Sequence, residues 1–254
     1  MDLSERKRSS LDGSRHPWET VRSEFFIDLV RGTVQSPQHI AWLDVGAGDS
    51  WLGAAIEDAL PSGSSMTCWD ANYEASDITT LSATYPKIKF STDRPHQQFD
   101  FISLLDVLEH VEEDRSFLTG LVKHCLSPNG KVMVSVPVHP ALFSRHDVAL
   151  RHFRRYTPDE CRRLLRDAGL AIDQEGGLFG VLLPARAASA FTERVLSRMR
   201  TPPQPSGVGQ WRAPACVTRL FEATLRADVR LSNIARRRGF LLPGLSYWAL
   251  ARQL

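Results

Sequence analysis

The sequence predicts an α/β fold: a doubly wound, mostly parallel sheet with helices on both faces. Short apolar runs bounded by turn residues are typical of strands that are buried on both faces. These runs alternate with segments whose apolar residues recur at helical spacing, which indicates right-handed crossovers between parallel strands. At 254 residues and 43% hydrophobic composition, the chain can bury the core of one large domain.

The predicted elements alternate regularly up to residue 170. Residues 16–30 place apolar side chains at helical spacing, with Pro17 in the first turn, and so predict a leading amphipathic helix. Residues 138–156, after the fifth strand, are expected to form a long loop. Strands are expected over residues 40–45, 65–69, 88–91, 99–105 and 131–136, and helices over residues 50–60, 74–84, 111–126 and 157–168.

The pattern changes after Gly180. Residues 181–200 and 213–237 predict helices, and residues 201–209 between them, TPPQPSGVG, predict a linker rich in Pro and Gly. Another strand-like run appears at residues 245–251. We therefore expect a helical insertion near the C-terminus, between the last two strands of the sheet.

The net charge of +2 hides an uneven distribution. From Arg186 onward there are 12 Arg against Glu193, Glu222 and Asp228, a balance of +9, which leaves −7 for the first 185 residues. A basic surface of this kind can bind nucleic acid or anionic lipid. A solvated helical surface is the plainer interpretation.

The cysteines and the first residues bear on the compartment. Four cysteines lie far apart without a Cys-x-x-Cys pair, as expected for reduced thiols in a cytosolic protein. No apolar signal-peptide core follows the charged first ten residues, and no apolar run reaches the roughly 18 residues of a spanning helix. The sequence thus predicts a cytoplasmic protein.

A glycine-rich turn, LDVGAGDSWLG over residues 43–53, follows the first predicted strand. Ligands of open α/β sheets bind where the first strand meets its helix, and glycine lets the backbone approach a ligand closely. The spacing does not fit the G-x-G-x-x-G of dinucleotide binding, and a phosphate-binding loop would need a lysine. Asp44 and Asp49 would repel a pyrophosphate but suit a ligand that bears an ammonium group.

The motifs, taken in order, resemble those of class I S-adenosylmethionine-dependent methyltransferases, in particular the small-molecule, quinone and lipid types. LDVGAGDS (residues 43–50) is similar to the first motif of that family, with Ser50 where a third glycine is usual. LSPNGKVMVSVP (residues 126–137) resembles the Lys-Pro-Gly-Gly turn and fifth strand, with Ser127 and Asn129 as departures. The other matching stretches are CWDA (68–71), STD (91–93), FDFISLLDVLEHV (99–111) and RRYTPDECRRLLRDAGL (154–170). The resemblance implies a Rossmann-like methyltransferase fold with a doubly wound, mostly parallel seven-stranded sheet.

The same resemblance implies roles in binding S-adenosylmethionine, which would leave as S-adenosylhomocysteine. Asp70 would accept hydrogen bonds from the ribose hydroxyls, although it could instead cap the next helix. Asp93 would accept from the adenine amino group, with an Asx-turn as the alternative. The expected cofactor-contacting residues are Asp44, Gly46, Ala47, Gly48, Asp70, Ala71, Asp93, Leu105 and Asp106.

The acceptor side is less defined by the sequence. Methyl transfer from a sulfonium is an in-line displacement, and a protonated acceptor needs a base, a role that suits histidine. His110, His139, His146 and His152 are all candidates, and the sequence does not choose among them. The cationic loop around residues 145–155 favours an anionic acceptor, or else forms salt bridges with the acidic part of the chain. The substrate-binding candidates are Arg145, Arg151 and Tyr156.

Metal binding is a weaker expectation. Asp106, Glu109 and His110 resemble the Glu-x-x-Glu-His that holds a divalent ion in some relatives, but Asp106 has a shorter side chain than glutamate. In the alternative, Glu109 and His110 hydrogen-bond to the loop and hold the start of the helix. We expect no metal.

The sequence therefore favours methyl transfer to a small, anionic or lipid-like acceptor within a single domain spanning residues 1–254. Its expected parts are a helical extension (1–35), a cofactor-binding core (36–180), a helical insertion covering the acceptor site (181–240) and the last strand (241–254). One rival is a protein of this fold that binds nucleic acid, which we consider unlikely, or a membrane surface through the basic C-terminal helices. Another is a protein that binds the cofactor without transferring methyl. The oligomeric state is not predicted.

Overall fold

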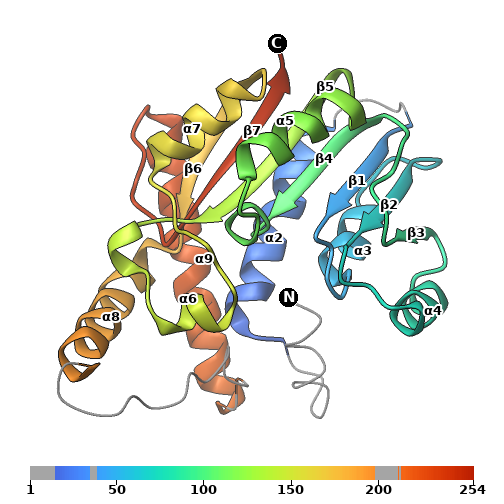
Figure 1. Cartoon of the computed structure of the whole chain (residues 1–254). Helices are drawn as coiled ribbons and strands as arrows, with labels where there is room; N and C mark the ends of the chain where they lie inside the picture. The colour runs from blue at the N-terminus through green and yellow to red at the C-terminus, as the bar shows by residue number, and fades with distance from the viewer. Residues whose placement is uncertain (1–14, 35–38, 198–210, 212) are drawn as a thin grey trace.

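The computed structural model describes residues 15–34, 39–197, 211 and 213–254. Its sheet contains seven strands in the order β3-β2-β1-β4-β5-β7-β6 (Figure 1). β1 to β5 pair in parallel, whereas β7 is antiparallel to both of its neighbours, β5 and β6. The predicted fold class is confirmed: the sheet is doubly wound and mostly parallel, with helices on both sides.

The strands are β1 (Ala41–Val45), β2 (Ser65–Trp69), β3 (Ile88–Ser91), β4 (Phe99–Leu105), β5 (Leu126–Pro137), β6 (Leu170–Leu178) and β7 (Ser246–Gln253). The helices are α2 (Pro17–Thr33), α3 (Trp51–Glu57), α4 (Ala75–Thr84), α5 (Asp114–Cys125), α6 (Arg145–Ala149), α7 (Pro158–Asp167), α8 (Leu183–Ser197) and α9 (Ala215–Arg237). Three single 3₁₀ turns are η1 (Leu108–His110), η2 (Pro140–Leu142) and η3 (Gly180–Leu182).

Most elements lie where the sequence places them, with local differences. The helix expected from residue 111 begins at Asp114, because the chain first makes the turn η1. The expected loop contains the short helix α6, which Ser144 and Asp147 start with a reciprocal capping box. β6 has no counterpart among the expected strands. The linker over residues 201–209 and the first 14 residues of the expected extension lie outside the described residues.

Two apolar layers cover the two faces of the sheet (Figure 1). α5 and α7 bury one layer, which includes Leu118 and Leu165. α2 and α9 bury the other, in which Phe26 and Leu225 are inaccessible to solvent. α9 is also tied to α2 by a bidentate ion pair, because the Arg226 guanidinium donates to both carboxylate oxygens of Glu24 at 2.8 Å. The leading helix and the inserted helix therefore form one wall of the domain.

Candidate active site

The turn that follows β1 contains three residues with positive φ angles. Gly46 and Gly48 have φ angles of +65° and +55°, and Ser50 follows at +57°, just before α3. The Gly46 N–H donates to the carbonyl of Trp69 at 2.7 Å, which holds the turn against the end of β2. A Cβ on Gly46 would lie 2.7 Å from Cγ2 of Val107. Glycine is thus required here both by φ and by close packing.

Asp44, the last acid before the turn, is buried. The Ser103 hydroxyl donates to its carboxylate at 2.6 Å, and Trp42 Nε1 donates to the same hydroxyl at 2.8 Å. Burial raises the pKa of Asp44 to about 6, although the hydrogen bond from Ser103 acts in the opposite direction. A cation placed beside this carboxylate would relieve the cost of its ionisation.

Asp70 lies directly after β2 and faces the turn. Its Oδ2 accepts from the Gly48 N–H at 3.0 Å, while Oδ1 accepts from the backbone N–H and the side-chain amide of Asn72 at 2.9 and 3.1 Å. A carboxylate has about four acceptor sites, so it retains capacity for one further donor. The neighbouring Ala71 is exposed, and so is Asp93 beyond the end of β3.

Helix α2 supplies the opposite wall of a small cavity at this turn. The Arg22 guanidinium extends from α2 so that Nη2 lies 2.9 Å from Oδ2 of Asp106, while its buried Nε has no hydrogen-bond partner among the described residues. Arg15, which lies just before the start of α2, forms an ion pair with Asp49. The cavity is lined by Arg15, Glu19, Arg22, Ser23, Asp44, Val45, Gly46, Ala47, Asp49, Trp51, Leu52 and Leu105.

A second group of polar side chains follows the end of β4. Asp106 has a φ of +60°, and the Ser135 hydroxyl donates to it at 2.9 Å. Glu109 is inaccessible to solvent, and neither of its carboxylate oxygens has a hydrogen-bond partner among the described residues. Burial, followed by the charge of Asp106, raises the pKa of Glu109 well above its ordinary value.

Two of the four candidate histidines meet at Glu109. The rings of His110 and His152 contact edge to face, with centroids 4.6 Å apart. One potential ligand atom from each of Glu109, His110 and His152 lies within 4.8 Å of the others. His139 is elsewhere, with Nε2 2.9 Å from the carbonyl of Gly244. Of the four candidate histidines, the structure therefore brings His110 and His152 together and places His139 elsewhere.

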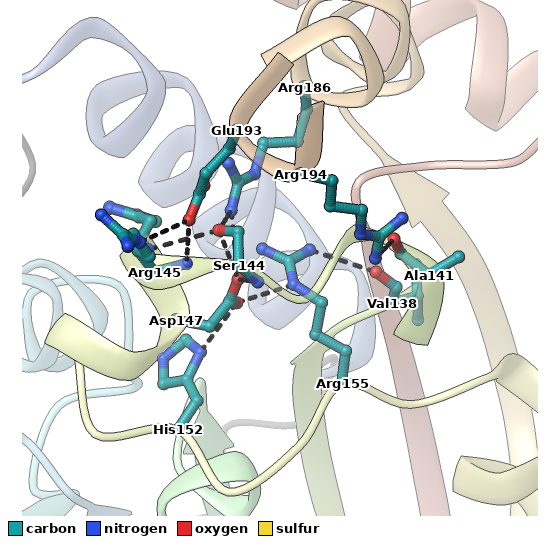
Figure 2. A network of polar contacts seen from close by, with 11 residues as sticks. Val138, Ala141, Ser144, Arg145, Asp147, His152, Arg155, Arg186, Glu193 and Arg194 are labelled. Carbon is teal, nitrogen blue, oxygen red and sulfur yellow. Dashed lines mark hydrogen bonds and ion pairs between the residues drawn. The ribbon is translucent and has the colours of Figure 1, made fainter. Parts of the chain in front are cut away.

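Asp147 holds His152 in place (Figure 2). His152 Nδ1 lies 3.2 Å from the Asp147 carboxylate, which also accepts from Arg155 Nε at 2.7 Å and from Arg186 Nη2 at 3.1 Å. Ser144 adds its N–H and its hydroxyl. Burial alone would raise the pKa of Asp147, but the hydrogen bonds from His152 and Arg155 and the charge of Arg155 lower it below the ordinary value.

The remaining expected residues are spread around this cluster. Tyr156 is buried, and its hydroxyl donates to the Leu108 carbonyl and to Asp114, so it fixes the turn η1. The Arg145 N–H donates to Glu193 of α8, and Arg151 is exposed with a φ of +59°. Burial, followed by the charge of Arg186, lowers the pKa of His146. The sequence analysis did not single out Arg22, Ser103 or Asp147 for this site. Arg22 pairs with Asp106 from a distant part of the chain, a contact without a local sequence signal.

Together, a seven-stranded sheet of this order, a glycine turn after β1 and an acid after β2 define a class I S-adenosylmethionine-dependent methyltransferase. Residues 18–175 match the model of the methyltransferase domain family. The match covers more than half of the sequence. The chain belongs to this methyltransferase domain family, and its cofactor is S-adenosylmethionine.

Individual relatives are more distant. The ubiquinone biosynthesis O-methyltransferase of Rickettsia canadensis is 26% identical over 132 residues, which cover 48% of this chain and 53% of the relative. That of Rickettsia typhi is 27% identical over 130 residues, covering 48% and 51%. The chain thus spans about half the length of the curated relatives it matches. An S-adenosylmethionine-dependent methyltransferase structure from Mesorhizobium loti is similar in fold, with a TM-score of 0.55 and 15% identity over 89% of this chain and 96% of that one.

Proposed function

We propose that this methyltransferase transfers the methyl group of S-adenosylmethionine to a hydroxyl oxygen of a small molecule. The observation that carries the proposal is the group formed by Glu109, His110 and His152. Glu109 and His110 follow β4, at the same sheet edge as the glycine turn, and His152 comes from the segment between β5 and α7. Carboxylate and imidazole side chains can take up or displace the hydroxyl proton. The ubiquinone O-methyltransferase relatives, which match about half of this chain, support an oxygen acceptor.

The cofactor would lie between α2 and the glycine turn. The residues fit it: Asp44 is a buried carboxylate that a cationic ammonium group would stabilise, and Asp70 has acceptor capacity for one ribose hydroxyl. The unpartnered Nε of Arg22 suits the carboxylate of the methionine moiety. Asp93 stays a prediction for the adenine amino group. The bound sulfonium supplies an electrophilic methyl carbon.

On the acceptor side, His152 is the candidate general base that the geometry favours. Its Nδ1 faces the Asp147 carboxylate, so a proton held on Nδ1 leaves Nε2 as the acceptor. Asp147 is then a positioning residue, since it orients and polarises the imidazole. Arg145 and Arg151 remain proposals for binding an anionic acceptor, and a substrate contact for the buried Tyr156 stays a prediction. The helices α8 and α9 as a cover over the acceptor remain a proposal as well.

One observation favours a variant of this chemistry. A fully buried carboxylate without a hydrogen-bond partner is costly, and a divalent cation held by Glu109, His110 and His152 would remove that cost. Such a cation would lower the pKa of a bound hydroxyl and so replace the general base. The same residues would then act as ligands.

The substrate class can be tested with methyl-labelled S-adenosylmethionine. The full chain is incubated with cell extract separated into a small-molecule fraction and a macromolecular fraction. Label in the small-molecule fraction supports the proposal, and label confined to RNA or protein contradicts it. Mass spectrometry of the labelled product identifies the methylated atom.

Metal dependence separates the two forms of the mechanism. If His152 is the base, activity survives treatment with EDTA and drops at least a hundredfold in His152→Gln. If a cation is required, EDTA abolishes activity and Mg²⁺, Mn²⁺ or Zn²⁺ restores it. Arg163→Gln, an exposed substitution on α7, serves as the control that leaves activity unchanged.

A further inference from the structure

The outward face of α9 is apolar. Leu220 is 69% exposed, Leu231 58% and Ile234 48%, and Val217 continues the row toward the start of the helix. These positions share one side, because 11 residues make about three helical turns and three residues make about one. Phe240, Leu241 and Leu242 follow the end of α9 and are exposed too. Several large, exposed apolar side chains on one side of a helix indicate an interaction site.

Arginines line one flank of this surface. Arg219, Arg230 and Arg237 are exposed and lie about three and two turns apart, so they form a row along α9. Both acids of α9, whose 23 residues are all described, are engaged elsewhere. Glu222 accepts from Arg226, and Asp228 accepts from the N–H groups of Gly180 and Val181. The exposed flank therefore carries positive charge without a compensating acid of its own helix.

A groove of about 470 Å³ runs beside the arginine row, between α9, α2 and the strands β6 and β7. Arg230, Arg236 and Arg237 line it on the α9 side. Arg236 donates to Gln174 at 3.0 Å, but its buried Nε has no partner among the described residues. Two acids of α2 also line the groove: Glu24, which is held by Arg226, and Asp28, 3.8 Å from Arg31. Because both acids face other arginines, the groove has space and positive charge for a phosphate group.

We infer that this surface docks on an anionic phospholipid bilayer, with the apolar row and residues 240–242 in the interface and lipid phosphates at the arginines. A helix with a long apolar stripe and an Arg flank is the pattern of an interfacial helix. The charge argues against a second copy as the occupant, because two such arginine rows would repel each other. No helix in the described part of the chain has the length and apolarity needed to cross a bilayer.

This inference does not depend on the acceptor. α9 is fastened to α2 through Arg226 and Glu24, and α2 carries Arg22 at the cofactor cavity. Docking would therefore hold the lipid surface one helix away from the reaction site.

Flotation with lipid vesicles tests the inference on the full chain at 0.15 M salt. We expect co-flotation with phosphatidylcholine vesicles containing 30 mol% phosphatidylglycerol, loss of binding in pure phosphatidylcholine, and release at 0.5 M salt. Arg230→Glu/Arg237→Glu and Leu231→Gln/Ile234→Gln should each weaken binding about tenfold or more. All four positions are at the surface, and circular dichroism verifies that each variant is folded.

Arg163→Glu/Arg166→Glu on α7 is the matched control, since it makes the same charge change on the opposite side of the sheet. Its binding should equal that of the unaltered chain. The inference is overturned if the unaltered chain does not float with anionic vesicles, or if the α9 variants bind as well as the α7 control. It is equally overturned if light scattering shows a dimer that the α9 variants dissociate while vesicle binding is absent.

Discussion

The Asp70 carboxylate accepts a hydrogen bond from the backbone N–H of Gly48 at 3.0 Å. An acid at the end of one strand thus fixes the glycine turn at the end of its neighbour. Through this contact, the residue expected to bind the ribose also shapes the turn expected to receive the methionine moiety.

Replacing Asp70 by Asn should lower affinity for S-adenosylhomocysteine by tenfold to a hundredfold. The amide has one acceptor oxygen instead of two, and charge-assisted hydrogen bonds are worth about 1.5–3 kcal/mol. Isothermal titration calorimetry measures the change. Asp58→Asn, an exposed acid after α3, is the control and should bind normally. Unchanged affinity in Asp70→Asn would show that the cofactor lies elsewhere.

Gly46→Val should abolish cofactor binding while the sheet still forms. The new side chain would clash with Val107, and a φ of +65° costs a residue with a Cβ about 1–2 kcal/mol. The double variant Gly46→Ala/Val107→Ala removes the clash but keeps the φ cost. Val107→Ala should therefore cost less stability in the Gly46→Ala background than in the unaltered chain, as measured by urea unfolding, and an equal cost in both backgrounds would contradict the steric account.

Stability should respond to pH through Asp44, whose pKa burial raises to about 6. A raised pKa gives stability that is fully present below the ordinary value near 3.8 and is lost as pH rises through 6. The variant Asp44→Asn has no carboxyl group at this position, so it does not lose this stability as pH rises. Relative to the unaltered chain, it should therefore gain about 2 kcal/mol between pH 4.5 and pH 7.5 in urea unfolding. A pH-independent difference would show that Asp44 titrates normally.

Asp147→Ala should destabilise the fold by about 3–5 kcal/mol, because it leaves the buried Arg155 without its carboxylate. The pKa of Asp147 is lowered, whereas that of Asp44 is raised, so the two carboxylates affect stability in opposite directions. The stabilisation from Asp147 is present above the ordinary pKa of aspartate and is lost as pH falls below that value. Asp159→Ala removes an exposed pair with Arg162 and should cost less than about 1 kcal/mol. Similar losses in both variants would argue against a buried network.

The sequence predicted the strands best where apolar runs were short and sharply bounded. The bounds of β2, β3 and β4 coincide with the expected residues 65–69, 88–91 and 99–105. The apolar pattern did not predict β6, because more than half of its residues, LAIDQEGGL, are polar or glycine. The five-residue α6 starts with the capping box of Ser144 and Asp147, a local signal that the sequence analysis did not use. It is also held by Arg186 from α8, a distant contact that has no local signal.

The candidate site divides in the same way. The glycine turn and Asp70 are local features of a motif, so the sequence predicted that they belong to one site. The choice among four histidines could not be made from the sequence, because tertiary packing brings His152 to His110 and sends His139 to Gly244. Arg22 reaches Asp106 only because α2 packs on the sheet beside β1.

β7 is synthesised after every other strand, yet it pairs with both β5 and β6. During translation, β5 and β6 therefore each lack this partner until residues 246–253 leave the ribosome. Exposed strand edges are templates for aggregation, so this interval is when a chaperone would matter most. Deletion of residues 246–253 would therefore separate β6 from the five parallel strands rather than trim the edge of the sheet.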